Sequence, residues 1–252
     1  MADDDRVVLV TGGSRGIGRA IARRFGEAGD TVVVQYATNE VAAAETVAAL
    51  GPGRHLAARA DVSDPEDVRS LVERVIGELG RIDVLINNAG IYEGHPVLDT
   101  GYDAWQASWR RTLDTNLVGP ANLIHQVVPH MVEVGGGRIV NVTSRGAFRG
   151  EPDHAAYGAS KAGLNSLGQS MARALAPLGI YVTTVAPGFV ETDMAAPYLD
   201  GAEGDAIRAQ TPMERAATPD EIARVVVFLA SPGSESTTGA IVDVNGASYL
   251  RT

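Results

Sequence analysis

Tyr157 and Lys161 stand four residues apart in the segment GAFRGEPDHAAYGASKAGLNSL, which covers residues 146–167. Side chains at positions i and i+4 lie on one face of a helix, so the Lys161 ammonium is expected beside the Tyr157 hydroxyl. A nearby cation favours the phenolate and should lower the tyrosine pKa from about 10 towards the operating pH. The pair predicts a tyrosine that exchanges protons, although a Tyr and a Lys at this spacing more often form only a solvated helix face.

Three glycines follow the first apolar run of the chain. Gly12, Gly16 and Gly18 have the spacing G-x-x-x-G-x-G within TGGSRGIG, residues 11–18. Glycines permit a tight strand-to-helix turn and let the backbone approach a pyrophosphate, whose charge the N-terminus of a helix favours. The run alone could be a packed turn, but its place after a first strand indicates a nucleotide site. The predicted contacts are Gly12, Ser14, Arg15, Gly16, Ile17 and Gly18.

The end of the second apolar run bears on the kind of dinucleotide. An Asp or Glu at this place binds the free ribose diol of NAD, but the run ends in Tyr36, Ala37 and Thr38. The Arg15 guanidinium can pair with a phosphate, although a solvated loop residue is the other interpretation. We therefore expect NADP(H) ahead of NAD(H), with Tyr36, Ala37 and Thr38 among the contacts.

Apolar, β-branched runs that alternate with amphipathic stretches supply the framework for these groups. The expected strands are residues 7–11, 31–36, 55–61, 82–88, 138–144, 180–187 and 240–246, and the expected helices are 15–28, 40–50, 65–79, 103–132, 155–177 and 218–230. Continuous apolar strands separated by helices indicate a parallel sheet covered on both faces. We predict an α/β fold, a Rossmann-type doubly wound, mainly parallel seven-stranded sheet with helices on both faces.

Length and composition favour one domain. The 252 residues are 45% apolar and contain no low-complexity run, which fits a single nucleotide-binding domain over residues 1–252. Residues 191–219 are less regular and contain three prolines. Because this segment follows the carboxyl end of a strand, it suits a substrate lid at about 191–217. A disordered insertion is the alternative.

Composition also excludes several classes of function. The absence of cysteine excludes disulfides, thiolate catalysis and thiolate metal sites, and the five histidines are not spaced as metal ligands. A net charge of −10 argues against nucleic acid or an anionic membrane as the partner. We find neither a secretory signal pattern nor an apolar run that could span a bilayer. A soluble, cytoplasmic protein with a small-molecule partner and no metal is expected.

Several motifs then occur in one order along the chain. They are Thr11-Gly12-x-x-x-Gly16-x-Gly18, Asn87-Asn88-Ala89-Gly90, Asn116, Ser144, Tyr157-x-x-x-Lys161 and Pro187-Gly188. Together they resemble the short-chain dehydrogenase/reductase family over almost the whole sequence. In that family the serine stands thirteen residues before the tyrosine, as Ser144 does before Tyr157 here. The resemblance implies hydride transfer between a nicotinamide cofactor and a ketone or secondary alcohol.

The same resemblance implies roles for four residues. Tyr157 is similar to the family's proton donor, and Ser144 to the hydroxyl that polarises the substrate carbonyl. Lys161 would bind the nicotinamide ribose and depress the pKa of Tyr157. Asn116 resembles the residue that bends its helix and holds a water linking Lys161 to solvent. When the cofactor supplies the hydride, the chain must add a proton, orientation and oxyanion stabilisation.

Further cofactor contacts follow from the resemblance alone. They are Asp61 and Val62 at the adenine ring, Asn88, Ala89 and Gly90 beside the adenosine ribose, Tyr157, Lys161, Pro187 and Gly188, and Val190 and Thr192 near the carboxamide. Asp61 also lies shortly before Pro65, so Ser63 or Asp64 can cap a helix there while Asp61 faces the cofactor. The NNAG run could be a turn, yet it ends a strand where a crevice opens in such sheets.

An apolar stripe indicates self-association. Trp105, Trp109, Leu113 and Leu117 recur at i+4 along the helix that leads to Asn116. Such a stripe is more often core than a ligand site, and in the resembled family this helix packs against a second subunit. We expect a homotetramer, with a homodimer as the alternative.

The substrate is less clearly marked. The enzymes that the sequence resembles include 3-oxoacyl-carrier-protein reductases, together with sugar, polyol and steroid dehydrogenases of similar length. Carrier-protein reductases place cations where this chain has Gly135 and Leu178, which favours a free small ketone over a carrier-bound acyl chain.

The residues expected around the substrate are 146–154, 92–96 and 191–212. Arg145, Arg149 and His154 could recognise a carboxylate or phosphate, or could simply be solvated. A non-catalytic cofactor-binding scaffold is the minor alternative, because all four residues implied in catalysis are present.

Overall fold

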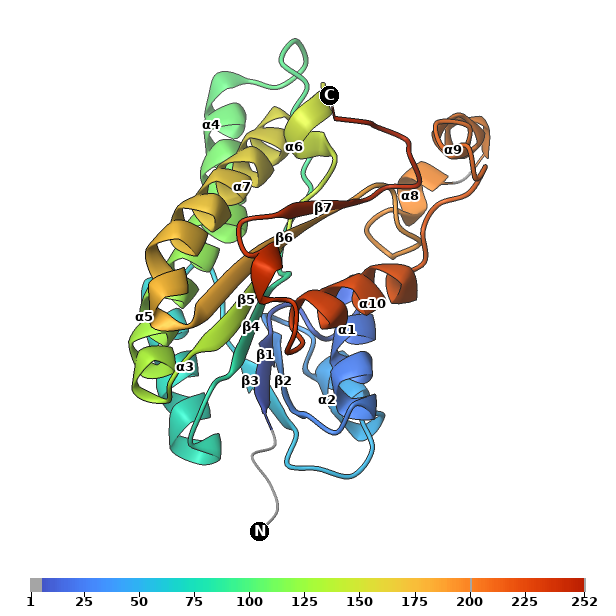
Figure 1. The fold of residues 1–252 in the computed structure, drawn as a ribbon. Coiled ribbons are helices and arrows are strands. Elements are labelled where there is room, and N and C mark those ends of the chain that lie inside the picture. Colours follow the sequence, from blue (N-terminus) through green and yellow to red (C-terminus); the bar gives the residue numbers. More distant parts are fainter. Residues whose placement is uncertain (1–5, 200, 252) are drawn as a thin grey trace.

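The computed structural model describes residues 6–199 and 201–251. Residues 1–5, 200 and 252 of the predicted domain (1–252) lie outside the described residues, and residue 200 also belongs to the predicted lid (191–217). Seven parallel strands form one sheet in the order β3-β2-β1-β4-β5-β6-β7 (Figure 1). They are β1 (Val7–Val10), β2 (Thr31–Tyr36), β3 (Leu56–Arg59), β4 (Val84–Asn87), β5 (Gly137–Val142), β6 (Ile180–Pro187) and β7 (Ile241–Val244). The predicted doubly wound α/β fold is confirmed.

The central strands consist of β-branched and other apolar residues that are buried on both faces. All residues of β1 and β4 are buried, as continuous apolar runs predict for a parallel sheet. Val8 of β1 is in register with Val32 of β2 on one side and with Val84 of β4 on the other. The chain order reverses between β1 and β4, so a crevice is expected at the carboxyl ends of these two strands.

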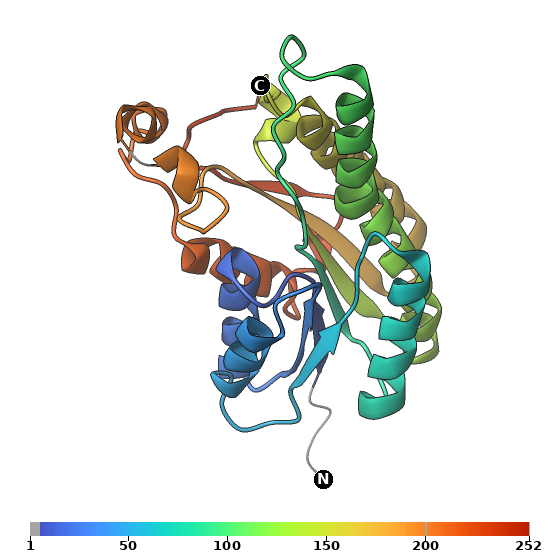
Figure 2. The ribbon, with the colours of Figure 1, turned by 180° about the vertical axis from the view of Figure 1, so that it is seen from behind.

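Helices cover both faces of the sheet (Figures 1 and 2). One face carries α1 (Gly16–Glu27), α2 (Glu40–Ala48) and α10 (Pro219–Leu229), and the other carries α3 (Pro65–Leu79), α4 (Tyr102–Leu113), α5 (Gly119–Glu133) and α7 (Ala155–Leu175). Two apolar cores result, one around Phe25 and Ile222 and the other around Leu123 and Met131, all fully buried. The short elements are α6 (Gly146–Arg149), η2 (Ala176–Leu178) and η3 (Glu235–Thr237).

The helix expected over residues 103–132 is interrupted. A π-helical turn, η1 (Asp114–Val118), separates α4 from α5 and contains Asn116. Periodicity does not reveal such a turn, because the apolar stripe continues through it. A Cβ on Gly119, the first residue after the turn, would lie 2.5 Å from the Val62 carbonyl oxygen. The irregular turn therefore accompanies close passage of the helix past the loop after β3, and such turns are frequent at functional sites.

The segment expected to form a lid is held together at its base. It contains α8 (Ala196–Leu199) and α9 (Gly201–Arg208), and Figure 1 shows both helices standing away from the sheet. Val190 and Ala217 form a parallel bridge. The Glu191 N–H donates to the Ala217 carbonyl at 2.9 Å, and the Ala217 N–H donates to the Phe189 carbonyl at 3.0 Å. Both ends of the segment thus meet at one point beside β6.

Candidate active site

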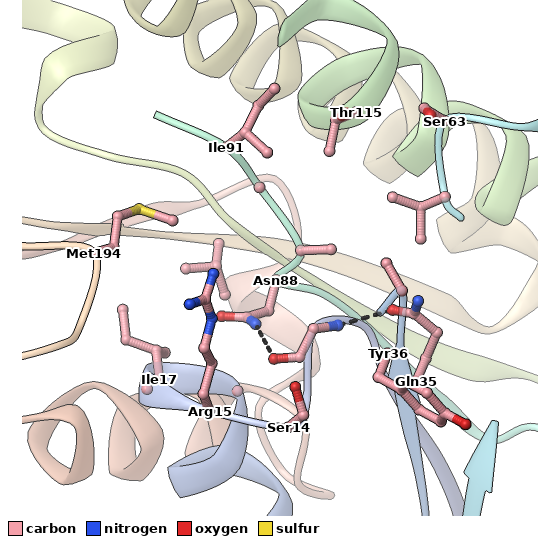
Figure 3. A pocket seen from close by; sticks show the side chains of 18 of the residues that line it. Ser14, Arg15, Ile17, Gln35, Tyr36, Ser63, Asn88, Ile91, Thr115 and Met194 are labelled. Carbon is pink, nitrogen blue, oxygen red and sulfur yellow. Dashed lines mark hydrogen bonds between the residues drawn. The ribbon is translucent and has the colours of Figure 1, made fainter. Parts of the chain in front are cut away.

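The glycine-rich loop joins β1 to α1 in a form that excludes larger side chains. Gly12 and Gly16 have φ angles of +61° and +52°, in the left-handed region that favours glycine. A Cβ on Gly18 would lie 2.1 Å from the Gly12 carbonyl oxygen. The Gly12 N–H donates to Gln35 Oε1 at 2.8 Å, and Asn88 Nδ2 donates to the Gly12 carbonyl at 3.3 Å (Figure 3). Two neighbouring strands therefore hold this loop in place.

The N-terminus of α1 is suited to an anion. Its N-cap residue, Arg15, makes no side-chain capping bond, and the first turn has no acidic residue. By contrast, Asn39, Asp64 and Thr218 cap α2, α3 and α10 through their side chains, and each of those helices begins with acidic residues. The exposed N–H groups and the helix dipole at α1 fit a phosphate group.

A cleft of about 700 Å³ runs from the end of β2 past the α1 N-terminus to Tyr157 (Figure 3). Most of the predicted cofactor contacts line it: Gly12, Ser14, Arg15, Gly16, Ile17, Gly18, Tyr36, Ala37, Thr38, Asp61, Val62, Asn88, Ala89, Gly90, Tyr157, Lys161 and Thr192. Pro187, Gly188 and Val190 do not line this cleft but a smaller cavity next to it. The size, the glycine-lined approach and the free helix terminus fit a dinucleotide.

Charged groups of both signs lie at or near the cleft end beside β2 and β3, because Arg15 and Asp61 line the cleft and Arg59 lies next to it. Tyr36 is buried, whereas Ala37 and Thr38 are exposed and carry no charge. Arg15 is exposed and extends into the cleft (Figure 3). Arg59 Nε donates to the Ala37 carbonyl at 3.3 Å, which places a second guanidinium at this end. Arg59 was not among the predicted contacts, because it lies within β3 (Leu56–Arg59) and not in the loop that follows the strand.

Asp61 and Asp64 have separate roles, because Asp64 caps a helix and Asp61 lines the cleft. Asp64 is the N-cap of α3 and accepts from the Glu66 N–H at 2.8 Å, so the predicted cap is confirmed. Asp61 lines the cleft, and its Oδ1 accepts from the Ser63 hydroxyl at 2.7 Å. One short segment thus starts a helix and presents a carboxylate to the cleft.

Asn116 lies fully buried behind the cleft wall. Its Oδ1 accepts from the Ile91 N–H at 2.9 Å, and its Nδ2 donates to the Ile91 carbonyl at 3.0 Å. A Cβ on Gly90 would lie 3.2 Å from Asn116 Oδ1 and 3.4 Å from Lys161 Nζ. The absent side chain of Gly90 therefore leaves Asn116 and Lys161 facing a shared space.

The expected fall in the pKa of Tyr157 is wrong for the protein alone. Burial raises the pKa of Tyr157 to about 12, and a hydrogen bond with Ser144 only partly opposes this effect. Lys161 Nζ lies 5.7 Å from the centre of the Tyr157 ring and donates to the Val142 carbonyl at 3.0 Å. Burial lowers the pKa of Lys161 to about 8. Helical spacing brings the two groups together as predicted, but desolvation decides their pKa values.

A smaller cavity of about 110 Å³ adjoins the cleft at Tyr157. Ser144 lines this cavity and lies outside the cleft lining, whereas Tyr157 lines both. Tyr92 forms an aromatic wall, because its ring packs edge-on to Tyr157 at 4.8 Å and stacks on His154 at 3.7 Å between ring centres. His154 Nε2 and the Tyr198 hydroxyl are 3.2 Å apart. Each of the three segments expected around the substrate contributes to this wall.

The interpretation of Arg145 and His154 as solvated groups is wrong. Both side chains are buried, while Arg149 is exposed. Burial lowers the pKa of His154. Arg145 lines the smaller cavity. Sequence position placed these residues near the substrate, but their depth depends on the lid and on Phe189, which cover them in three dimensions.

Further residues line the cleft besides the predicted cofactor contacts, and three of them, Glu93, Asp193 and Met194, fall in segments expected around the substrate. The further residues are Gln35, Asn39, Ser63, Ile91, Glu93, Arg111, Asp114, Thr115, Val142, Thr143, Asp193 and Met194. Most are chain neighbours of predicted contacts, so the available signal was adjacency at the carboxyl ends of strands. Gln35 differs, because it is buried and its Nε2 donates to the Ala60 carbonyl at 2.6 Å, bracing the glycine-rich loop from behind.

Within residues 6–199 and 201–251, no group of three or more His, Cys, Asp or Glu side chains could hold a metal ion. No helix in the part of the chain that the structure describes has the length and apolar character needed to cross a membrane.

The apolar stripe along α4 and η1 is only partly covered by the chain itself. Trp105, Trp109, Leu113 and Leu117 are all half-buried. The Trp105 ring packs against the buried His95 at 5.0 Å between centres.

Comparisons with known proteins agree with this geometry. A family model described as Enoyl-(Acyl carrier protein) reductase matches residues 12–247. The 3-oxoacyl-[acyl-carrier-protein] reductase FabG of Staphylococcus epidermidis is 37% identical over 98% of this chain and 100% of the relative. The FabG of Vibrio cholerae is 38% identical over 98% of each chain. A crystal structure of a short chain dehydrogenase from Burkholderia cenocepacia J2315 in complex with NADP superposes with a TM-score of 0.88 at 35% identity, covering 97% of this chain and 98% of the other. The chain belongs to the short-chain dehydrogenase/reductase family.

Proposed function

We propose that this protein is an NADP(H)-dependent oxidoreductase that interconverts a ketone and a secondary alcohol. One observation carries the proposal: Tyr157 lines both the long cleft and the smaller cavity, so a proton donor stands where the two spaces meet. A nicotinamide cofactor in the cleft supplies a hydride. The chain's own residues then have to bind the carbonyl compound, orient it and move a proton.

The proton donor is the Tyr157 hydroxyl, and Ser144 holds the carbonyl oxygen beside it. These two hydroxyls interact with each other, which places two polar groups at one point of the cavity. Both act on the oxygen as negative charge develops there. Lys161, fixed by the Val142 carbonyl, faces the cleft and binds a ribose hydroxyl. Asn116 holds the water that connects Lys161 with solvent.

The pKa of Tyr157 determines the protonation state of the proposed acid in the unliganded protein. With the pKa raised to about 12 by burial, the phenol keeps its proton at neutral pH. A protonated phenol is the form that donates to an alkoxide, whereas alcohol oxidation needs the phenolate as the base. At neutral pH the unliganded protein therefore holds Tyr157 in the form that acts as the acid in ketone reduction.

Two features support NADP(H) over NAD(H). The cleft end at Tyr36, Ala37 and Thr38 has no carboxylate to bind a free ribose diol. Arg15 and Arg59 place guanidinium groups at or near the cleft, where one of them can form charge-assisted bonds to a 2′-phosphate. The related Burkholderia cenocepacia dehydrogenase is described in complex with NADP.

The experiment replaces the proton donor. Tyr157→Phe should lower kcat by about 10²- to 10⁴-fold, the usual contribution of general acid catalysis. NADPH affinity, followed by fluorescence titration, should stay near the wild-type value. Tyr102→Phe is the matched control, because Tyr102 is 73% exposed on α4. A substantial residual rate would remove Tyr157 from the acid role. A wild-type protein that binds NADPH yet reduces no ketone would instead favour the non-catalytic scaffold.

A carrier-bound acyl chain is the second candidate substrate, favoured by the 3-oxoacyl-carrier-protein reductases among the relatives. Against it, the two positions compared with cations of carrier-protein reductases hold an uncharged leucine and a glycine in this chain. Leu178 is 48% exposed, and Gly135 lies in a turn with φ +91°. We propose a free small ketone. Sugar and polyol substrates remain the further alternative. Rates with 3-oxoacyl carrier protein and with the same acyl group on a short thiol, at low and high salt, separate the first two.

A homotetramer in the cytoplasm completes the proposal. The half-buried stripe from Trp105 to Leu117 and the exposure of Val118 leave apolar surface that a second copy can cover. We place the protein in the cytoplasm because a nicotinamide cofactor that dissociates after turnover has to be regenerated by other enzymes of the same compartment.

A further inference from the structure

Arg145 is a buried guanidinium at the substrate end of the site. It follows Ser144 directly in the chain, is 2% exposed, and lines the 110 Å³ cavity together with Ser144 and Tyr157. A cation at this depth is rare unless it is paired, because removing it from water is costly. Arg145 therefore needs a partner, and the structure allows its partners to be named.

The partners in the chain do not neutralise Arg145. Its Nη2 donates to Gln210 Oε1 at 2.8 Å, and its guanidinium carbon lies 5.1 Å from the centre of the Phe189 ring. Gln210 is uncharged and also accepts from Arg149 Nη1 at 3.0 Å. Among residues 6–199 and 201–251, no carboxylate lies within ion-pair distance of Arg145. Two like charges thus share one amide oxygen, and the other N–H groups of Arg145 have no acceptor in the described chain.

Glu151 is the carboxyl group that could have filled this role. It lines the same cavity and interacts with Arg145 and Arg149 through space, without an ion-pair contact. Burial raises the pKa of Glu151, and the two guanidinium groups only partly offset this effect. Because Glu151 forms neither a hydrogen bond nor an ion pair with Arg145, it does not occupy the guanidinium N–H groups of Arg145.

The cavity also limits the size of the ligand. It is about 110 Å³, far smaller than the adjoining cleft of about 700 Å³. Tyr92, Tyr198 and Phe189 line it with aromatic rings. A short, compact molecule fits, and the fork of a guanidinium matches a carboxylate in two parallel bonds.

We propose that the substrate is a short oxo acid whose carboxylate pairs with Arg145 while its ketone oxygen lies at Ser144 and Tyr157. This assignment rests on the proposed function and adds a substrate class to it. In the reaction the carbonyl carbon gains a hydride from the reduced cofactor and the oxygen gains the Tyr157 proton, which solvent replaces. Oxo acid, NADPH and a proton give hydroxy acid and NADP⁺, and the carboxylate is unchanged.

The test compares acids with neutral analogues. Pyruvate, acetoacetate and levulinate are assayed with NADPH against their methyl esters and against fructose, a polyhydroxy ketone. We expect at least one acid to exceed its ester in kcat/KM by tenfold or more. Arg145→Gln should lower that acid-to-ester ratio by about 10- to 100-fold, as the loss of charge-assisted bonds predicts. Arg149→Gln, which removes an exposed cation outside the cavity lining, should change the ratio less than threefold.

A second measurement does not depend on the folding of a variant. Butyrate should inhibit the wild-type enzyme competitively against the preferred ketone, at a concentration at least tenfold below that needed for butyramide. Esters reduced as well as acids, equal losses for both in Arg145→Gln, or a preference for fructose would each overturn the oxo acid assignment and leave the oxidoreductase intact. Reduction of none of these ketones, acid or neutral, would instead contradict the proposed function.

Discussion

Lys161→Met should make the protein inactive and more stable. Lys161 is 4% exposed, and burial lowers its pKa from 10.5 to about 8. One unit of pKa is about 1.4 kcal/mol, so at pH 7 the buried ammonium destabilises the fold by about 3 kcal/mol. Methionine has a similar length and no charge, but it loses the bond to the Val142 carbonyl, worth about 1 kcal/mol. The net gain is about 2 kcal/mol, or roughly 4–8 °C in Tm.

The sign of the pH dependence follows from the two pKa values. Between the folded value of about 8 and the unfolded value of 10.5, the unfolded chain binds more protons, so wild-type stability rises with pH in this window. The advantage of Lys161→Met should therefore shrink by about 2 kcal/mol between pH 7 and pH 9.5. Lys161 is the only lysine in the sequence, so no other lysine titrates in this range.

Urea unfolding followed by tryptophan fluorescence measures the difference, at pH 7 and pH 9.5, without nucleotide and at one protein concentration. Arg23→Met, which removes an exposed cation from α1, is the control and should shift stability by less than about 0.5 kcal/mol. A ¹³C-lysine label gives a single side-chain resonance, whose titration reads the pKa directly. A less stable Lys161→Met at pH 7, or a difference that does not narrow with rising pH, would refute desolvation as the cause.

Three further outcomes are expected. Gly18→Ala should lower the free energy of unfolding by about 1–3 kcal/mol and abolish NADPH binding, because its Cβ would meet the Gly12 carbonyl. Gly77→Ala, on open helix surface, should instead raise the free energy of unfolding by about 0.5–1 kcal/mol. Equal effects of the two variants in urea unfolding would contradict the steric argument. Arg15→Gln should lower the ratio of kcat/KM for NADPH over NADH by about tenfold or more, and a wild-type preference for NADH would defeat this assignment. Light scattering should give a tetramer at micromolar concentration, and a monomer would exclude the proposed use of the Trp105 stripe.

Sequence patterns were sufficient for the framework and for the order of the site residues. The seven strands could be predicted because each is a run of β-branched and apolar residues between helices, with limits correct to about two residues. The glycine-rich loop was readable because its spacing has a steric cause, seen in the 2.1 Å approach at Gly18. Asp64 was readable as a cap from the proline that follows it.

The burial and solvation of the site residues could not be predicted from sequence patterns. The i+4 spacing of Tyr157 and Lys161 gives proximity, but the raised pKa of Tyr157 comes from the burial that several distant segments create. Arg145 looked like a cleft-mouth residue because its position beside Ser144 does not show that Phe189 and Gln210 cover it. The π-helical turn at Asn116 was hidden because one extra residue in a turn leaves the apolar pattern nearly unchanged.

The bridge between Val190 and Ala217 has a consequence for how this enzyme can change its substrate. Because residues 191–217 leave and rejoin the sheet at one clamped point, their length and composition can be altered without shifting the register of β6 and β7. Doubling the length of such a loop costs only about 0.6 kcal/mol of closure entropy. Tyr198 and Gln210, which touch His154 and Arg145, both belong to this excursion. Residues 195–217 can thus be exchanged as one contiguous segment, by recombination in nature or by grafting in the laboratory, while Thr192, Asp193 and Met194 are kept because they line the cofactor cleft.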